Sequence, residues 1–234
     1  MPTGGPNSLN PNVAPGGNFD LSIWSIQLPI GTTGKPTTIP NTQLEGASGF
    51  QDTYFQTDTS NGAMAFDDPS KGCVTTPNSV HCRSELSEVD PSSGIAAAWS
   101  ASGTNTMTAT LLAGKISTSV VVGQIHITES QSVRPYGELF YALSGALTWG
   151  QEQTPAGGNE KSTSVGSVAV GTKFTYVISF SKGAFSVSIN GKATSIAVPA
   201  AFPSTFTYYF KAGDYGQGSA DTTDEFFALN VAHS

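Results

Sequence analysis

Two short segments place polar side chains at the two-residue spacing of a β-strand. Arg83 and Glu85 share one strand face, and Gln124 and His126 share another. A carboxylate two residues from an arginine holds the guanidinium in a fixed orientation, and an imidazole accepts a proton near neutral pH. Each pair taken alone also fits a surface ion pair or a structural histidine, so neither pair defines a site by itself.

A third segment, YFKAGDYGQ at residues 209–217, combines two tyrosines, a lysine and a glutamine with two glycines. Tyr209 and Lys211 share a strand face, whereas Tyr215 and Gln217 follow where the glycines let the chain bend or approach a ligand closely. A tyrosine, with a reference pKa of about 10, acts as a base only when cations lower that pKa. An amphipathic strand without a chemical role fits this segment equally well.

The elements that must carry these side chains are β-strands rather than helices. Only 12% of the residues are charged, and 26 Gly and 14 Pro interrupt helices, while 38% hydrophobic residues suffice for a core. From residue 18 onward, turn residues break short apolar runs about every ten residues, as in a sandwich or barrel. We expect one all-β domain over residues 18–234, preceded by a flexible, Pro/Gly/Asn-rich N-terminal arm at residues 1–17.

The clearest strand pattern lies in residues 174–189, where apolar and polar residues alternate. Asn190-Gly191 then supplies the positive φ angles of a two-residue hairpin. A short helix is expected within residues 42–50, and residues 150–166 are expected to form a long exposed loop. Further strands are predicted at Leu21–Gln27, Met64–Phe66, Ser84–Val89, Ile95–Ser100, Thr106–Leu112, Val120–Thr128, Glu138–Ala142, Phe206–Ala212 and Glu225–Ala232.

In this order, RSEL at residues 83–86, QIH at 124–126 and YFKAGDYGQ at 209–217 resemble motifs of the alginate lyases of polysaccharide lyase family seven. Weaker matches at residues 24–31 and 62–66 extend the resemblance over nearly the whole folded chain. It implies a β-jelly roll sandwich of two antiparallel sheets with a substrate groove across the concave sheet. Ser87 departs from the family, because the first motif commonly continues there with a second arginine that contacts substrate.

The resemblance also implies β-elimination on a 1,4-linked uronic acid polymer such as alginate. This reaction removes the C5 proton next to the carboxylate and expels the oxygen at C4. Arg83 and Gln124 match the positions that bind that carboxylate, and such preorganised donors contribute several kcal/mol. His126 matches the neutraliser and possible base, and Tyr215 matches the base and acid. The expected substrate-binding residues are Glu85, Tyr209, Lys211 and Gln217. No cofactor and no metal is expected.

The charge balance limits the partners of the chain. Ten Lys and Arg against 17 Asp and Glu give a formal net charge of −7, which disfavours nucleic acid and anionic membrane surfaces. No apolar stretch approaches the roughly 20 residues that cross a bilayer. The first residues lack a signal-peptide pattern, so we expect a leader upstream of Met1 in the full-length gene, and a secreted, extracellular monomer.

The only two cysteines, Cys73 and Cys82, are close enough in sequence to close one loop with a disulfide. In an oxidising compartment this bond would stabilise the fold by about 2–3 kcal/mol. Two free buried thiols are the alternative. A zinc site is not supported, since tetrahedral zinc needs four ligands and the three histidines lack the spacing of zinc ligands.

Other functions stay open on the sequence alone. A glycoside hydrolase needs two carboxylates flanking the scissile bond; Glu88 and Asp90 share a strand face, but Pro91 should end that strand. A carbohydrate-binding module would need aromatic platforms and no acid–base pair. Glucuronan lyases have a similar glutamine–histidine–tyrosine site and are the nearest alternative.

Two further readings find little support in the sequence. A Ser-His-Asp hydrolase is unsupported because no Gly-x-Ser-x-Gly turn occurs. Residues 220–225 are acidic but lack the EF-hand pattern of a calcium loop. Endo cleavage is expected, whereas the preference for mannuronate or guluronate blocks stays open.

Overall fold

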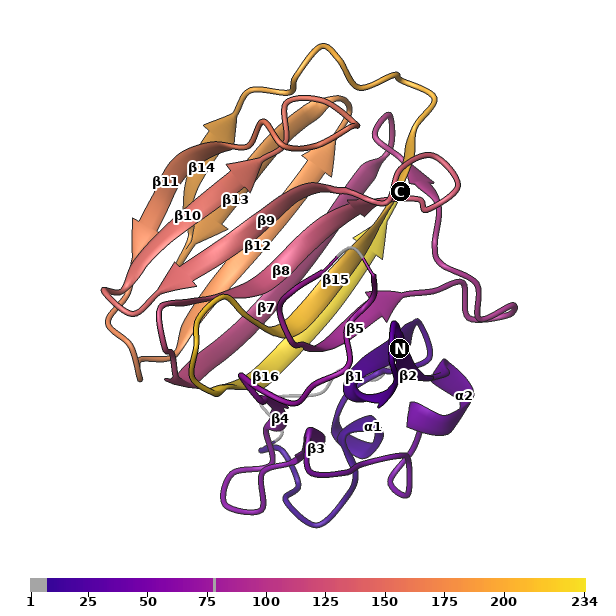
Figure 1. Cartoon of the computed structure of the whole chain (residues 1–234), viewed down its shortest axis with the longest axis vertical. Helices are drawn as coiled ribbons and strands as arrows, with labels where there is room; N and C mark the ends of the chain where they lie inside the picture. The colour runs from indigo at the N-terminus through magenta and orange to yellow at the C-terminus, as the bar shows by residue number, and fades with distance from the viewer. Residues whose placement is uncertain (1–7, 78) are drawn as a thin grey trace.

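The computed structural model describes residues 8–77 and 79–234, which form two antiparallel β-sheets packed as layers (Figure 1). The nine-stranded sheet contains β11 (Lys161–Ser167), β10 (Ala146–Gln151), β9 (Pro135–Ala142), β8 (Ser119–Ile127), β15 (Thr207–Gly216), β5 (Ser84–Glu88), β1 (Trp24–Thr32) and β2 (Lys35–Ile39) in this order, with β6 (Trp99–Ser100) on β15. The seven-stranded sheet contains β14 (Lys192–Ile196), β13 (Ala184–Ile189), β12 (Phe174–Ser181), β7 (Thr104–Lys115), β16 (Thr222–His233), β4 (Met64–Asp68) and β3 (Phe55–Thr57). The prediction of an all-β jelly roll with two antiparallel sheets is confirmed.

The core lies between the two sheets, and strand alternation selects the side chains that enter it. In β12, Phe174, Tyr176 and Ile178 are buried while the residues between them are partly exposed. Aromatic rings interlock across the core, as between Phe66 and Phe226, whose ring centroids are 5.2 Å apart. Because apolar side chains occupy the inward positions, the alternate positions of each strand face outward, where the site forms.

The predicted hairpin at Asn190-Gly191 is present. Asn190 has φ of 48° and Gly191 has φ of 81°, and the flanking residues Ile189 and Lys192 pair across β13 and β14. Both residues therefore adopt the left-handed conformations of a two-residue turn that follows the twist of the strands.

The prediction that residues 150–166 form one long loop holds only for residues 152–160 and is wrong at both ends. β10 extends to Gln151 and β11 begins at Lys161, and these two residues pair directly, so only the segment between them lies outside the strands. β11 is an edge strand in which Val165 alone is buried. With a single inward apolar residue, the strand has no alternating pattern that sequence reasoning detects.

Two other predicted elements are shorter than expected. Within Ile95–Ser100 only β6 (Trp99–Ser100) is a strand, and the helix expected in residues 42–50 is a single turn, α2 (Asn41–Leu44). A further turn, α1 (Pro15–Asn18), lies near the amino-terminal end. No helix in the described residues has the length and apolarity needed to cross a membrane.

Part of the predicted N-terminal arm lies outside the described residues, because the structure describes the chain from residue 8. Within residues 8–17, the Ala14 N–H donates to the Ala47 carbonyl at 2.9 Å, and Ala14 is buried. The boundary between arm and domain at residue 17 stays a prediction.

Candidate active site

The three motifs meet because their strands are neighbours in the nine-stranded sheet, in the order β8, β15, β5 (Figure 1). Lys211 pairs with Gln124, and Tyr209 pairs with His126, across β15 and β8. On the other side of β15, the register with β5 places Gly213 opposite Glu85. Directly paired residues of adjacent strands point to the same face, so polar side chains far apart in sequence form one cluster.

Glu85 is the centre of this cluster. Its side chain is 1% exposed, and its carboxylate contacts Lys211 Nζ at 2.5 Å and Arg83 Nη1 at 3.2 Å. Gln124 Nε2 donates to the second carboxylate oxygen. Burial alone would raise the pKa of Glu85, but the charges of Lys211 and Arg83 more than offset burial and hold this pKa below its usual value. Two cations and one carboxylate leave the cluster with one net positive charge.

Glu85 was predicted to bind substrate, and the structure places it beneath the residues that would do so. Its side chain is 1% exposed, and its carboxylate fixes the orientation of the two cations and of the Gln124 amide. A direct contact between Glu85 and substrate stays a prediction. An amide has two N–H donors, so Gln124 keeps one beyond the bond to Glu85. Lys211 is 5% exposed, and its ammonium group is held by the buried Glu85 carboxylate.

Tyr215 lies beside Arg83, whose guanidinium carbon is 3.7 Å from the centroid of the tyrosine ring. Ser79 joins the two side chains: its Oγ accepts from Arg83 Nη2 at 3.0 Å and lies 3.3 Å from the Tyr215 hydroxyl. Gln217 follows in the chain, and its Nε2 donates to the Tyr215 carbonyl at 3.3 Å. Tyr215 and Gln217 therefore lie together at the end of β15, next to the arginine.

A β-bulge in β15 sets the position of Tyr215. The register between β15 and β8 shifts by one residue between Ala212 and Tyr215. Gly213 has φ of 146°, and a Cβ at this position would lie 2.6 Å from the Ser84 carbonyl oxygen. Only glycine fits here, because a side chain would clash with the neighbouring strand.

His126 is a neutral imidazole whose Nδ1 is bonded to the backbone. Its Nδ1 lies 2.8 Å from the Ile127 carbonyl oxygen, and since a carbonyl can only accept, Nδ1 carries the hydrogen. Burial, assisted by the charge of Lys211, lowers the pKa of His126 to about 4. At neutral pH the Nε2 lone pair is therefore available to take a proton.

A pocket of about 240 Å³ opens over this cluster. Four predicted site residues line it: Arg83, His126, Tyr209 and Lys211. Four lining residues were not predicted from the sequence: Gln27, Thr76, Glu129 and Val133. Gln27 pairs directly with Glu85 across β1 and β5. Its position within residues 24–31, a weaker part of the family resemblance, was the available signal. The other three lie on loops, where no strand pattern points to them.

The loop between β4 and β5 crosses in front of β15 (Figure 1). The predicted disulfide is present in it: Cys73 and Cys82 are bonded, with their Cα atoms 5.8 Å apart. The same loop carries Ser79 and His81, and the His81 ring lies 6.2 Å from the Tyr215 ring. The disulfide thus restrains the segment that contacts Arg83 and Tyr215.

Glu88 lies on the opposite side of the strand from this cluster. It is 3% exposed, and its carboxylate accepts from Trp99 Nε1 at 2.9 Å and from the Phe210 N–H at 2.8 Å. His233 Nε2 lies 2.6 Å from its other oxygen. These bonds occupy both carboxylate oxygens of Glu88, on the face of β5 opposite Glu85. Glu88 and Asp90 line a separate pocket of about 400 Å³ with Trp99 and His233, so this acid pair is not part of the cluster around Arg83 and His126.

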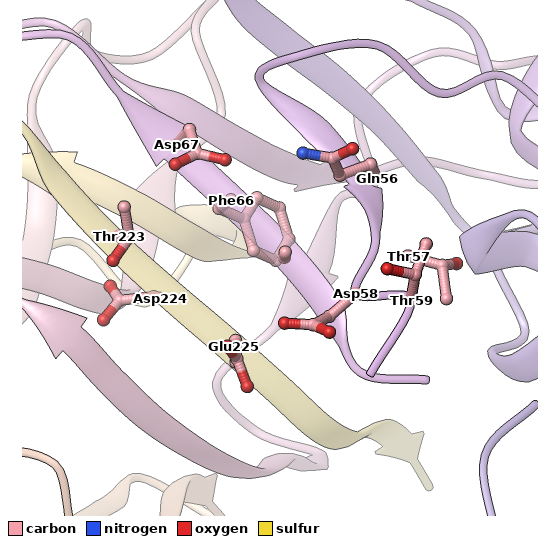
Figure 2. A pocket seen from close by; sticks show the side chains of 10 residues that line it. Gln56, Thr57, Asp58, Thr59, Phe66, Asp67, Thr223, Asp224 and Glu225 are labelled. Carbon is pink, nitrogen blue, oxygen red and sulfur yellow. The ribbon is translucent and has the colours of Figure 1, made fainter. Parts of the chain in front are cut away.

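A further pocket, of about 310 Å³, lies over the other sheet (Figure 2). Its lining includes the carboxylates of Asp58, Asp67 and Glu225, which come from the segment after β3, from β4 and from β16, respectively. Such a lining repels a polyanion, so the pocket near His126 is the candidate substrate site. Within the described residues, no three or more His, Cys, Asp or Glu side chains are grouped so as to hold a metal ion.

An antiparallel jelly roll that presents an arginine, a glutamine, a neutral histidine and a tyrosine on one sheet face defines a class of enzyme, the polysaccharide lyases. Comparison with known proteins narrows this class. The family model described as alginate lyase matches residues 19–233. The chain belongs to the alginate lyase family, as the sequence motifs predicted.

Individual relatives agree with this assignment. A variant of the family 7 alginate lyase A1-II′, solved with bound product, is 31% identical, with 95% of this chain and 100% of that chain covered and a TM-score of 0.84. An alginate lyase structure from Pseudomonas aeruginosa is 30% identical, with 92% and 100% covered and a TM-score of 0.81. A curated alginate lyase from Klebsiella pneumoniae is 26% identical over 94% of this chain and 91% of its own length.

Proposed function

We propose that this chain cleaves alginate by β-elimination at the pocket over Glu85, leaving unsaturated uronate ends. The observation that carries the proposal is the grouping of Arg83, Gln124 and Lys211 around one buried carboxylate, next to a neutral His126. One net positive charge matches the single carboxylate of each uronate unit. Family membership and the alginate oligosaccharides bound by the relatives' structures support alginate as the polymer.

The first step is neutralisation of the uronate carboxylate. A carboxylate anion is a poor acceptor of further charge, so removal of the neighbouring C5 proton requires donors already in place around it. Arg83 and the free N–H of Gln124 supply these donors. Their orientation is fixed by Glu85 before substrate arrives, so little reorganisation is needed during the reaction.

The second step is proton transfer. His126 Nε2 or the Tyr215 oxygen takes the C5 proton, and the electrons of the C–H bond form the C4–C5 double bond as the bond from C4 to the glycosidic oxygen breaks. The Tyr215 hydroxyl donates a proton to the departing oxygen. Which of the two groups is the base depends on the face that carries the C5 proton, and this face differs between mannuronate and guluronate.

The proposal also covers the mode of cleavage, the sugar contacts, the compartment and the oligomeric state. Endo cleavage follows if the polymer lies across the sheet on both sides of the pocket. Tyr209, Lys211 and Gln217 then contact sugars near the cleaved bond. The Cys73–Cys82 disulfide is typical of an oxidising compartment and supports secretion, and we propose a monomer acting outside the cell.

The test is the ultraviolet absorbance of the unsaturated uronate, followed on polymannuronate, polyguluronate and glucuronan. A rise on either alginate block supports the proposal and gives the block preference. A rise on glucuronan alone would move the substrate to the alternative polymer with the same chemistry. Flat traces on all three polymers would contradict elimination as the reaction. Early release of mixed oligomer sizes, measured by gel filtration, distinguishes endo from exo cleavage.

A further inference from the structure

An acidic side chain faces the same side of the sheet as the site. Glu138 of β9 pairs directly with Gln124 of β8, so the two side chains point to the same face and lie next to each other. Glu138 is half-buried. A carboxyl group at this position is unexpected in an enzyme whose substrate is a polyanion.

A second carboxyl group lies on the other side of Glu138. The partner of Glu138 in β10 is Gly150. A Cβ at Gly150 would lie 2.4 Å from Cδ of Glu160 and 2.6 Å from both of its oxygens. The Glu160 carboxyl therefore fills the space left by the missing side chain. Gln124 of β8, Glu138 of β9 and the Glu160 carboxyl group, which lies over Gly150 of β10, therefore form a row.

The surroundings of Glu138 favour its protonated form. Burial is the main cause that raises the pKa of Glu138 to about 7, and the negative charges of Glu85 and Glu160 add to it, whereas Arg83 and Lys211 act in the opposite direction. Burial also raises the pKa of Glu160.

The protonation state of Glu138 changes the charge of the whole site. Arg83, Lys211 and Glu85 together carry one positive charge, which remains available to a substrate carboxylate while Glu138 is protonated. When Glu138 ionises, two cations face two carboxylates, and the site is neutral. The proton on Glu138 therefore changes by one unit the charge that the strands around Gln124 present to a uronate.

We propose that Glu138, supported by Glu160, is a specificity-determining residue for the uronate that binds beside Gln124. This inference rests on the proposed lyase function. The site accepts a substrate carboxylate there when Glu138 holds a proton and repels that carboxylate when Glu138 is ionised. In the protonated form, the Glu138 hydroxyl donates to the uronate oxygen, a charge-assisted hydrogen bond of the short and strong kind. Neutral sugars gain nothing from this arrangement.

The test is the pH dependence of KM and kcat on alginate, measured by absorbance between pH 6 and pH 8. The uronates stay ionised in this range, and His126 stays neutral, because its pKa is about 4. In the unmodified enzyme we expect KM to rise about tenfold from pH 6 to pH 8, because the protonated fraction of Glu138 falls tenfold per pH unit above its pKa. In Glu138→Gln this rise is absent.

Two further variants make the test specific. Glu160→Gln removes a negative neighbour of Glu138, so the rise in KM should begin at a lower pH. Glu225→Gln removes one negative charge from the outer face of the other sheet, and its profile should match that of the unmodified enzyme. A KM that rises in parallel in Glu138→Gln and the unmodified enzyme overturns this inference alone. If the unmodified enzyme forms no unsaturated product at any pH, the proposed function itself fails.

Discussion

Three aspartates lie inside the sandwich behind Tyr215, and their ionisation should control how stability depends on pH. Asp68, Asp214 and Asp224 come from β4, β15 and β16 and are at most 3% exposed. Asp68 accepts from the Gly216 N–H at 2.8 Å, and Asp214 accepts from Thr222 Oγ1 at 2.5 Å. Their remaining oxygens have no hydrogen-bond partner in the described residues. Ionised carboxylates in such surroundings are costly, so protons are retained there.

We expect Asp68→Asn to flatten the dependence of stability on pH. Burial raises the pKa of Asp68 from 3.8 to about 7, against the bond from Gly216 and the charge of Arg83, which lower it. Between these two values the native state binds a proton that the unfolded chain has lost. Stability therefore falls as the pH rises from about 4 to about 7. The variant keeps an oxygen that accepts from Gly216 but has no proton to lose.

The size of this effect follows from the change in pKa. A change from 3.8 to about 7 corresponds to roughly 4 kcal/mol of stability lost between pH 4 and pH 8. For a chain of this length, 1 kcal/mol shifts the melting temperature by about 2–4 °C. Over the same pH range, the melting temperature of the unmodified protein should thus fall by about 10 °C more than that of Asp68→Asn.

The assay is thermal unfolding followed by circular dichroism at five pH values from 4 to 8. Asp20→Asn, at an exposed position, is the matched control and should follow the unmodified protein. Comparing the slopes of melting temperature against pH removes any constant difference in stability that the amide itself causes. Parallel curves for Asp68→Asn and the unmodified protein would refute the reasoning, because they would mean that Asp68 does not retain a proton in the native state.

The other predictions concern the site and the loop above it. Tyr215→Phe and His126→Asn should each lower kcat on alginate by at least about 100-fold with an unchanged circular dichroism spectrum, since each removes a proton-transfer group; normal turnover in Tyr215→Phe would contradict its assigned role. Glu85→Gln should destabilise the fold by about 3 kcal/mol in urea unfolding, because two buried cations lose their counter-ion; a smaller cost than 1 kcal/mol would argue against the central position of this carboxylate. Cys73→Ser should lower stability by about 2–3 kcal/mol, measured under oxidising conditions, and an unchanged midpoint would show that the disulfide contributes nothing. A chelator should leave activity unchanged, and a loss restored by added metal would overturn the metal-free mechanism.

Much of the site was predictable because strand alternation is a local property. The backbone of a β-strand points every second side chain to the same face, whatever lies elsewhere in the chain. The pairs Arg83 with Glu85 and Gln124 with His126 could therefore be assigned to shared faces from spacing alone. The hairpin at Asn190-Gly191 was equally local, because only these residue types adopt its positive φ angles readily.

The burial of particular groups was not predictable in this way. Glu85 resembles a surface partner of Arg83 in sequence, yet it lies beneath Lys211 and is 1% exposed. Edge strand β11 has too few apolar residues to stand out from a loop. In both cases, the neighbours that determine the outcome belong to other segments, and no local pattern records them.

The sequence by itself determined which residues form strands, which faces they present and which family motifs they carry. Only the tertiary structure decided that β8, β15 and β5 are adjacent, that Glu138 and Glu160 lie beside Gln124, and that His126 is neutral. The physical reason is that pairing and desolvation depend on contacts between segments far apart in the chain. Alternation and turn geometry, in contrast, are fixed within a few residues.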